Sequence, residues 1–426
     1  MNTHVLDVVL DKVSKISQNK YLVALRDGMV ITIPFTIVGS IFLIITNLPF
    51  TGWSDIIAPI SSLLGPMVDV TFGMLSLIVL MGVSYQLAHL NRIDILSGVT
   101  ISVIAFLMTM MTDDFKIDTA NFGSGGMFTA IVVAIVCGEL LNFFYKKNWV
   151  IKLPDTVPPA VMKSFSACIP GGLTLLFVWF IRIVLNIDIN TLITKLFEPL
   201  VVGVNSFWGI LFVCFLMCAL WTLGIHGNNV VGSVSAPIFL SFLASNIEAV
   251  SQGQTPPYIV ADGFLQFGMA MGGTGAVIGL ALSMLFAKSK QYRALGKIGL
   301  VPSIFGISEP LMFGVPVVFN PILAIPFICI PMILVGISYI LMDLGIIGRV
   351  IATVPWTTPP VISGLLLTGG DWRAALWQGI EVILATLGYL PFFLKLDRIA
   401  LEKEKLETKE LEQSINLKNR GDVYES

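Results

Sequence analysis

Charged side chains are scarce in this sequence, and their scarcity decides the class of protein. Only 12% of the 426 residues are charged, whereas an average soluble domain has about a quarter. Hydrophobic residues make up 55%, and the mean hydropathy is +0.88. The net charge of −2 provides no basic surface for nucleic acid. We therefore expect an all-α polytopic membrane protein in contact with the lipid bilayer, and no nucleic-acid partner.

Residues that bind metals or act as nucleophiles are also few. The chain has three histidines and five cysteines, and the cysteines have neither zinc nor disulfide spacing: Cys137, Cys168, Cys214, Cys218 and Cys329. All five lie in apolar segments, so we expect them to be small core residues. No P-loop is present, and "GMAMGGTGAVIG" (268–279) misses the dinucleotide pattern by one residue. We expect its glycines to serve close helix packing, with no cofactor, no metal and no ATP-driven transport.

The first twenty residues lack the continuous apolar core of a cleavable signal, because charged residues interrupt them. Apolar residues recur on one helical face over residues 5–17. We expect a helix on the membrane surface there, either a plain one or a docking element.

Long apolar segments are what the sequence contains instead, and a bilayer-spanning helix needs about 20 such residues. Ten segments of this kind lie near residues 27–48, 67–88, 93–111, 126–145, 165–187, 206–225, 229–247, 260–287, 317–342 and 374–394. Three serines and Pro237 interrupt the seventh, so we expect a hairpin or a broken helix there.

Lysine and arginine predict the orientation, because cytoplasmic loops collect them. With the N-terminus inside, 20 of the 25 fall in cytoplasmic segments: residues 12–26, Arg92, 146–163, 288–297 and 395–420. We therefore expect a multi-pass protein of the plasma membrane with both termini cytoplasmic. The alternating charges of the tail, residues 397–426, indicate a short solvated helix and then disorder.

Two apolar stretches are too rich in glycine and proline to be plain spans. They cover residues 299–316 and 350–369. Irregular backbone at membrane depth persists only where protein or a water-filled cavity satisfies its polar groups. We expect both stretches to be re-entrant, and in transporters such segments line the substrate site.

The stretch "LWTLGIHGNNVVG" (220–232) is the first candidate for binding chemistry. His226 follows the sixth apolar segment, and Gly227, Asn228 and Asn229 come directly after it. Glycine and asparagine tolerate unusual backbone angles, and a histidine with two carboxamides offers the donors and acceptors that a polyhydroxylated ligand needs. The alternative is an ordinary loop histidine facing the cytoplasm.

The stretch "GISEPLMFG" (306–314) is the second candidate, since it places Glu309 in an apolar part of the chain beside Ser308. An ionisable residue within the membrane costs about 2.5–3.5 kcal/mol on insertion scales and indicates function. Pro310 makes a continuous helix unfavourable, so we expect Glu309 on a loop tip, as an acceptor for sugar hydroxyls or a proton. A helix cap or a pair with Lys or Arg is the alternative.

A third candidate, Trp356 in "VPWTTPPVISG" (354–364), offers an aromatic face on which a sugar ring can stack. A tryptophan of the membrane interface is an equal alternative. The proline-rich loop "LPDTVPPAVMKSF" (153–165) is compatible with a docking surface or with a rigid connection.

Together, "GISEPLMFGVPVVFNP", "GIHGNN", "LPDTVPPAV" and "ALRDGM" resemble the membrane IIC component of a sugar phosphotransferase system. The closest branch is the lactose/cellobiose/diacetylchitobiose family, and the resemblance covers about residues 1–400. It implies a permease that couples uptake of a β-linked disaccharide to its 6-phosphorylation. The phosphate comes from a phosphocysteine on the IIB component, which IIA supplies, and we expect both to be separate polypeptides.

The resemblance also implies roles for the candidate residues. Glu309 would accept a hydrogen bond from the hydroxyl that is phosphorylated, or act as its base, and His226 would bind the same sugar. Gly227, Asn228, Asn229 and Ser308 are weaker candidates, and Trp356 rests on stacking chemistry. The chain would position the sugar without being phosphorylated itself.

The resemblance further implies a homodimer with the sugar in the C-terminal half. We expect an N-terminal membrane half (1–200) for dimerisation and scaffold, a C-terminal half (201–396) with the sugar site, and the charged tail (397–426). The main alternative is a proton- or sodium-coupled sugar symporter without phosphorylation. A receptor or scaffold with a vestigial site is a third possibility.

Overall fold

The computed structural model describes residues 15, 18–46, 52–154, 156–315 and 317–421. The surface helix expected over residues 5–17 and the last five residues of the tail lie almost wholly outside that range. The described elements are helices, with one isolated β-bridge between Met111 and Ile117. The chain is therefore all-helical, as expected.

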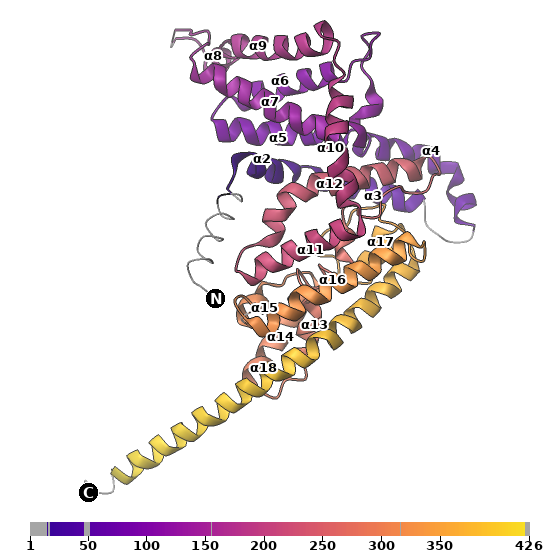
Figure 1. The fold of residues 1–426 in the computed structure, drawn as a ribbon. Coiled ribbons are helices and arrows are strands. Elements are labelled where there is room, and N and C mark those ends of the chain that lie inside the picture. Colours follow the sequence, from indigo (N-terminus) through magenta and orange to yellow (C-terminus); the bar gives the residue numbers. More distant parts are fainter. Residues whose placement is uncertain (1–14, 16–17, 47–51, 155, 316, 422–426) are drawn as a thin grey trace.

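Helices α2 to α10 come from the first half of the chain. They are α2 (Lys20–Met29), α3 (Thr32–Thr46), α4 (Trp53–Thr71), α5 (Leu75–Asn91), α6 (Ile95–Thr109), α7 (Met127–Lys146), α8 (Pro159–Ser166), α9 (Cys168–Trp179) and α10 (Ile189–Val204). Helices α5, α6, α7 and α9 pack on one another and form one end of the molecule in Figure 1.

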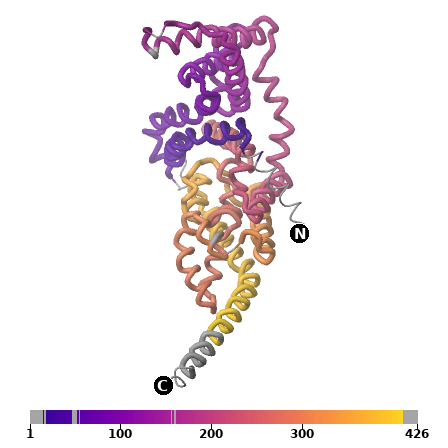
Figure 2. The backbone as a smooth tube through the Cα atoms, turned by 90° about the vertical axis from the view of Figure 1, so that its left-hand side faces the viewer, coloured from indigo at the N-terminus to yellow at the C-terminus, as the bar shows by residue number. Residues whose placement is uncertain are grey.

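The second half of the chain forms the other end. Its helices are α11 (Phe207–Thr222), α12 (Gly227–Ser251), α13 (Ile278–Met284), α14 (Lys290–Ile304), α15 (Glu309–Gly314), α16 (Pro321–Asp343), α17 (Ile362–Leu367) and α18 (Trp372–Gly421). Figure 2 shows the elongated outline that results, with α10 running along one side from the first group toward the second. Helix α2 contacts both α5 and α12 and so joins the two groups.

Among the described residues, six helical stretches are long and apolar enough to cross a membrane. They are Lys20–Thr46, Asp55–Asn91, Ser124–Lys146, Gly227–Ser251, Pro321–Asp343 and Trp372–Lys409. The pair Cys168–Val184 and Ile189–Val204, bent by 89°, makes seven if it counts as one span. Helices α6 and α11 are apolar but shorter. The chain is a polytopic helical membrane protein, with fewer full-length candidate spans than the ten expected.

Two of the expected spans are wrong in detail. The segment 260–287 is not a continuous helix: it contains only a short 3₁₀ turn, η4 (Phe264–Gln266), and the seven-residue α13. Conversely, residues 229–247 lie within one unbroken 25-residue helix, α12. The helix continues through its serines and Pro237, and the hydroxyl of Ser233 donates to the Val230 carbonyl of the same helix.

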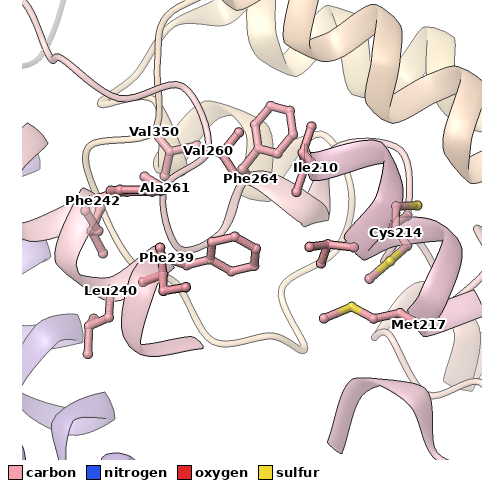
Figure 3. Packing of buried hydrophobic residues seen from close by; sticks show 14 of the residues in the cluster. Ile210, Cys214, Met217, Phe239, Leu240, Phe242, Val260, Ala261, Phe264 and Val350 are labelled. Carbon is pink, nitrogen blue, oxygen red and sulfur yellow. The ribbon is translucent and has the colours of Figure 1, made fainter. Parts of the chain in front are cut away.

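The non-helical segment is buried, and its surroundings are apolar. Phe264 and Phe267 are almost inaccessible. Figure 3 shows side chains of α11, α12 and residues 260–264 gathered in one cluster, among them Ile210, Phe239 and Phe264. High hydropathy here reflects burial in protein as much as contact with lipid.

Two asparagines, the buried Asn246 and the partly buried Asn205, supply partners for this irregular backbone. Asn246 of α12 donates to the carbonyls of Tyr258 and Val350 at 2.8 and 2.9 Å and accepts from Tyr258 N at 2.8 Å. The side-chain oxygen of Asn205 accepts from Ile259 N and Val260 N. Unpaired backbone groups would be costly in this environment, so these side chains determine where the irregular segments can lie.

The charged tail is not a separate helix. Residues 397–421 continue the last membrane helix as part of the 50-residue α18. Asp397 accepts from the backbone nitrogens of Lys288 and Ser289, and Glu404 from those of Lys290 and Gln291. These bonds join α18 to the start of α14.

The expectation that all five cysteines are core residues is correct for three of them and wrong for two. Cys137, Cys214 and Cys218 are buried as expected, whereas Cys168 and Cys329 are exposed. An apolar helix surface that faces lipid accommodates a thiol as readily as a protein core does.

Candidate functional site

A cavity of about 310 Å³ lies in the second half of the chain, where the α11–α12 turn meets three irregular segments. Its walls are Trp221, His226, Asn228, Gln266, Ala270, Gly273, Thr274, Gly306, Ser308, Glu309 and Trp356. Five of the seven residues expected from the sequence therefore come together. Gly227 and Asn229 are not among the walls.

The turn between α11 and α12 places His226 at the cavity. His226 is the N-cap of α12, and its Nδ1 accepts from the backbone N–H of Asn229 at 3.3 Å. A ring nitrogen that accepts carries no proton, so the neutral ring has its proton on Nε2. His226 therefore offers a donor, and its ring packs against Trp221 with centroids 4.5 Å apart.

Gly227 and Asn229 contribute through the backbone. A Cβ on Gly227 would lie 2.0 Å from the carbonyl oxygen of Met217, so only glycine allows this approach of α12 to α11. Asn229 supplies the N–H that His226 accepts. Both residues shape the turn and form no part of the cavity wall.

Asn228 has a fixed orientation. Its side-chain oxygen accepts from Trp221 Nε1 at 3.2 Å and from Thr274 Oγ1 at 2.8 Å. The indole N–H can only donate, so the atom that faces it must be the carboxamide oxygen. The two N–H groups of the amide are then the hydrogen-bonding capacity that Asn228 has left for a ligand.

Glu309 is the first residue of the six-residue helix α15, with Ser308 as N-cap. The expected loop tip is therefore wrong, because proline is well tolerated in the first helical turn, where Pro310 lies. The helix dipole favours a carboxylate at this position. Glu309 is exposed to the cavity, and no Lys or Arg of the described residues forms an ion pair with it. Its oxygens are thus open to a ligand.

Two glycines let the walls meet. Gly273 has φ +98°, and a Cβ there would lie 2.5 Å from the Cβ of Ser308, whose side chain is buried. Gly306 has φ +77° and would bring a Cβ to 3.0 Å from the carbonyl oxygen of Trp356. These contacts bring the segments of Thr274, Glu309 and Trp356 together, while the Trp356 side chain stays 66% exposed.

Several wall residues were not expected from the sequence. Gln266, Thr274 and Gly273 lie in the segment interpreted as a span and as a packing motif. Gly279 does pack closely against Ala385 of α18, as expected for such a motif. Trp221 lies within the stretch 220–232 that contains His226. Apart from this closeness in the sequence, nothing predicted that Trp221 would bond to Asn228.

The arrangement suits a polyhydroxylated ligand. One carboxylate accepts, an amide and an imidazole donate, and aromatic side chains provide apolar surface. No group of three or more His, Cys, Asp or Glu side chains able to hold a metal ion occurs in the described part of the chain.

Sequence comparison decides the family. The family model described as "Phosphotransferase system, EIIC" matches residues 26–331, which is more than half of the chain. The chain belongs to this family. The resemblance drawn from the motifs is thereby confirmed.

Individual EIIC proteins are similar over almost the whole length. The "PTS system cellobiose-specific EIIC component" of Geobacillus stearothermophilus is 37% identical over 94% of this chain and 95% of its own. The "Lichenan permease IIC component" of Bacillus subtilis (strain 168) is 36% identical over 93% of both chains.

The fold is also that of a solved EIIC protein. The crystal structure of the transporter ChbC, "the IIC component from the N,N'-diacetylchitobiose-specific phosphotransferase system", superimposes with a TM-score of 0.88. It is 37% identical and covers 93% of this chain and 98% of its own. The chain is thus an EIIC sugar permease and a multi-pass bacterial membrane protein.

Proposed function

We propose that this EIIC chain takes up a β-linked disaccharide of the cellobiose, lichenan or diacetylchitobiose type and presents it for 6-phosphorylation. The observation that carries the proposal is the cavity itself, where Glu309 accepts and Asn228 and His226 donate. The names of the similar EIIC proteins support the sugar class.

In this proposal Glu309 binds the hydroxyl that receives the phosphate. A carboxylate accepts a strong, charge-assisted hydrogen bond from a sugar hydroxyl and can take its proton as the phosphate arrives. His226 Nε2–H and the Asn228 amide bind neighbouring sugar oxygens, and Trp356 stacks on a ring face. The chain contributes position and orientation, while the phosphocysteine resides on the partner.

The partners in this proposal are separate IIB and IIA proteins. The similar proteins specific for cellobiose and lichenan bear the name of the IIC component alone. We propose that residues 299–316 and 350–369 are re-entrant and that both termini are cytoplasmic. We also propose a homodimer formed by the N-terminal half, residues 1–200. The distribution of Lys and Arg supports the orientation.

Vesicles that contain the purified chain test the function. They receive radiolabelled cellobiose, N,N′-diacetylchitobiose or lactose outside, and IIA, IIB and the phosphoenolpyruvate-dependent carriers inside. The expected product is a labelled 6-phosphodisaccharide in the lumen. Unmodified sugar that accumulates despite active IIB, and is lost when an uncoupler is added, would establish a symporter instead. Glu309→Gln in the same vesicles is the control for a process that uses the cavity.

A further inference from the structure

One fully buried side chain, Gln378 of α18, bonds to two of the segments that form the sugar cavity without lining the cavity itself. Its oxygen accepts from Val361 N at 2.8 Å, Gly364 N at 2.6 Å and Ser363 Oγ at 3.0 Å. Its Nε2 donates to the carbonyl oxygen of Gln266 at 3.2 Å. The partners in all four bonds belong to irregular segments or to very short helices, η4 and α17.

These bonds lead directly to two cavity walls. Gln266 is itself a wall residue, and its carbonyl is the acceptor for Gln378. Val361 follows Trp356 by five residues, through a turn closed by Thr358 N and the carbonyl of Pro355. Trp356 in turn contacts Gly306, which precedes the Glu309 wall.

The geometry at Val361 requires an external acceptor. Its φ is +75°, which a β-branched residue rarely adopts. Helix α17 begins directly after it, so the N–H groups of Val361 and Gly364 have no acceptor within that helix. A Cβ on Gly364 would lie 2.7 Å from the Gln378 oxygen, so glycine leaves the space that this oxygen occupies. The strained turn is thus built around Gln378.

Helix α18 makes related bonds further along. Tyr389 Oη donates to the carbonyl of Gly275 at 2.6 Å, and Figure 1 shows α18 running beside α13, α16 and α17. Gln378 differs because it bonds to the segment of Gln266 and the segment of Trp356 together.

We propose that Gln378 is a positioning residue for sugar binding, which acts by holding the Gln266 and Trp356 segments at the spacing that the ligand requires. The inference rests on the proposed function for the identity of the ligand. It makes no use of the phosphorylation step.

The test uses the purified full-length chain in detergent, without phosphocarriers. Gln378→Met has a similar volume and removes all four bonds, whereas Gln378→Glu keeps an acceptor for the three donors and, in its protonated form, a donor for the Gln266 carbonyl. Ser363→Ala removes one bond and covers the case in which Gln378→Met does not fold. Thr386→Val is the matched control on the same helix, because the Thr386 hydroxyl bonds only to Val382 of α18.

Hydrogen–deuterium exchange gives the first readout and does not need sugar. Faster exchange is expected in peptides covering 264–270 and 354–364 in Gln378→Met and, less so, in Ser363→Ala, but not in Thr386→Val. Unchanged exchange in both peptides would overturn the proposal.

Binding of cellobiose and N,N′-diacetylchitobiose gives the second readout. The Kd is expected to rise about tenfold or more in Gln378→Met, to recover to within about threefold in Gln378→Glu, and to stay unchanged in Thr386→Val. In a Trp356→Ala background the same Gln378→Met change is expected to cost less than about threefold, because the two residues act together. Equal losses in both backgrounds would overturn positioning. Failure of the unsubstituted chain to bind either sugar would count against the proposed function, and the exchange result would still decide this inference.

Discussion

The hydroxyl of Thr274 lies 2.8 Å from the side-chain oxygen of Asn228, which also accepts from the Trp221 indole. The oxygen is thereby occupied, and only the amide hydrogens are offered to a ligand. Asn228→Asp keeps an acceptor for Thr274 and Trp221 but replaces those hydrogens and adds a second carboxylate to the cavity.

For Asn228→Asp we expect a disaccharide Kd about 5- to 150-fold higher, since a lost bond and a new repulsion cost about 1–3 kcal/mol. Calorimetric titration of the purified chain measures it. Thr274→Val, which only loosens the amide, is expected to raise the Kd by about threefold. An unchanged Kd in Asn228→Asp would show that the amide hydrogens do not reach the sugar.

The substitution Glu309→Gln distinguishes two possible roles of Glu309, binding the sugar hydroxyl and removing its proton. The substitution preserves shape and removes the charge, so sugar binding is expected to weaken about tenfold. If Glu309 is also the base, phosphorylation at saturating sugar is expected to fall a further 10²-fold or more. Single-turnover transfer from phosphorylated IIB, compared with the Kd, distinguishes the two roles. Full activity in Glu309→Gln would exclude both.

Fluorinated sugars test the polarity of the cavity walls. Fluorine accepts weakly and cannot donate, so replacing a hydroxyl that faces Asn228 or His226 is expected to change the Kd by less than about threefold. Replacing the hydroxyl that faces Glu309 is expected to cost about tenfold or more. A series of monofluoro-cellobioses, measured by competition, is expected to show one position of strong loss. A uniform loss at all positions would contradict the donor and acceptor assignment.

Gly273→Ala tests the close contact between two walls. The added Cβ would meet Ser308 at 2.5 Å on backbone with φ +98°, so we expect loss of sugar binding together with a lower melting temperature. Gly232→Ala on α12 is the control, because its Cβ meets nothing within 4 Å. The control is expected to be neutral or to stabilise by up to about 1 kcal/mol. Equal effects of the two substitutions would argue against the contact.

Arg182→Met tests the 89° bend between α9 and α10. Arg182 is 4% exposed and donates to the Met111 carbonyl, Asp113 and Asn186. Its removal leaves the Met111 carbonyl without this donor, at a cost of about 1–3 kcal/mol. A melting temperature several degrees lower is expected in detergent, with an intermediate value for Arg182→Lys. The exposed Lys195→Met is the control and is expected to melt like the unsubstituted chain.

The polar residues of the candidate site could be predicted from the sequence because their chemistry differs from that of the surrounding apolar residues. Glu309 and His226 are ionisable groups in a chain with few of them, and their neighbours Ser308 and Asn228 came with them. Chemical contrast with the surroundings is a local property, and it needs no knowledge of the fold.

The other features of the candidate site depend on contacts between residues that are far apart in the sequence, and these could not be predicted. Thr274 and Asn228 are 46 positions apart, and Gln378 and Gln266 are 112 positions apart. No periodicity within either segment reports such a bond. The same limit explains segment 260–287, since hydropathy measures removal from water and does not distinguish a helix in lipid from irregular backbone buried in protein.

The contact of Gly273 with Ser308 also limits how the sugar specificity of this permease could change by mutation. Gly273 has no side chain to shorten, and the Ser308 side chain opposite leaves no room for a larger residue. Substitutions that change the sugar specificity are therefore expected at the other cavity-lining residues. Gln266 and the exposed Trp356 are examples, because smaller side chains can replace them. A selection for growth on new disaccharides should accumulate its mutations there and spare the glycines.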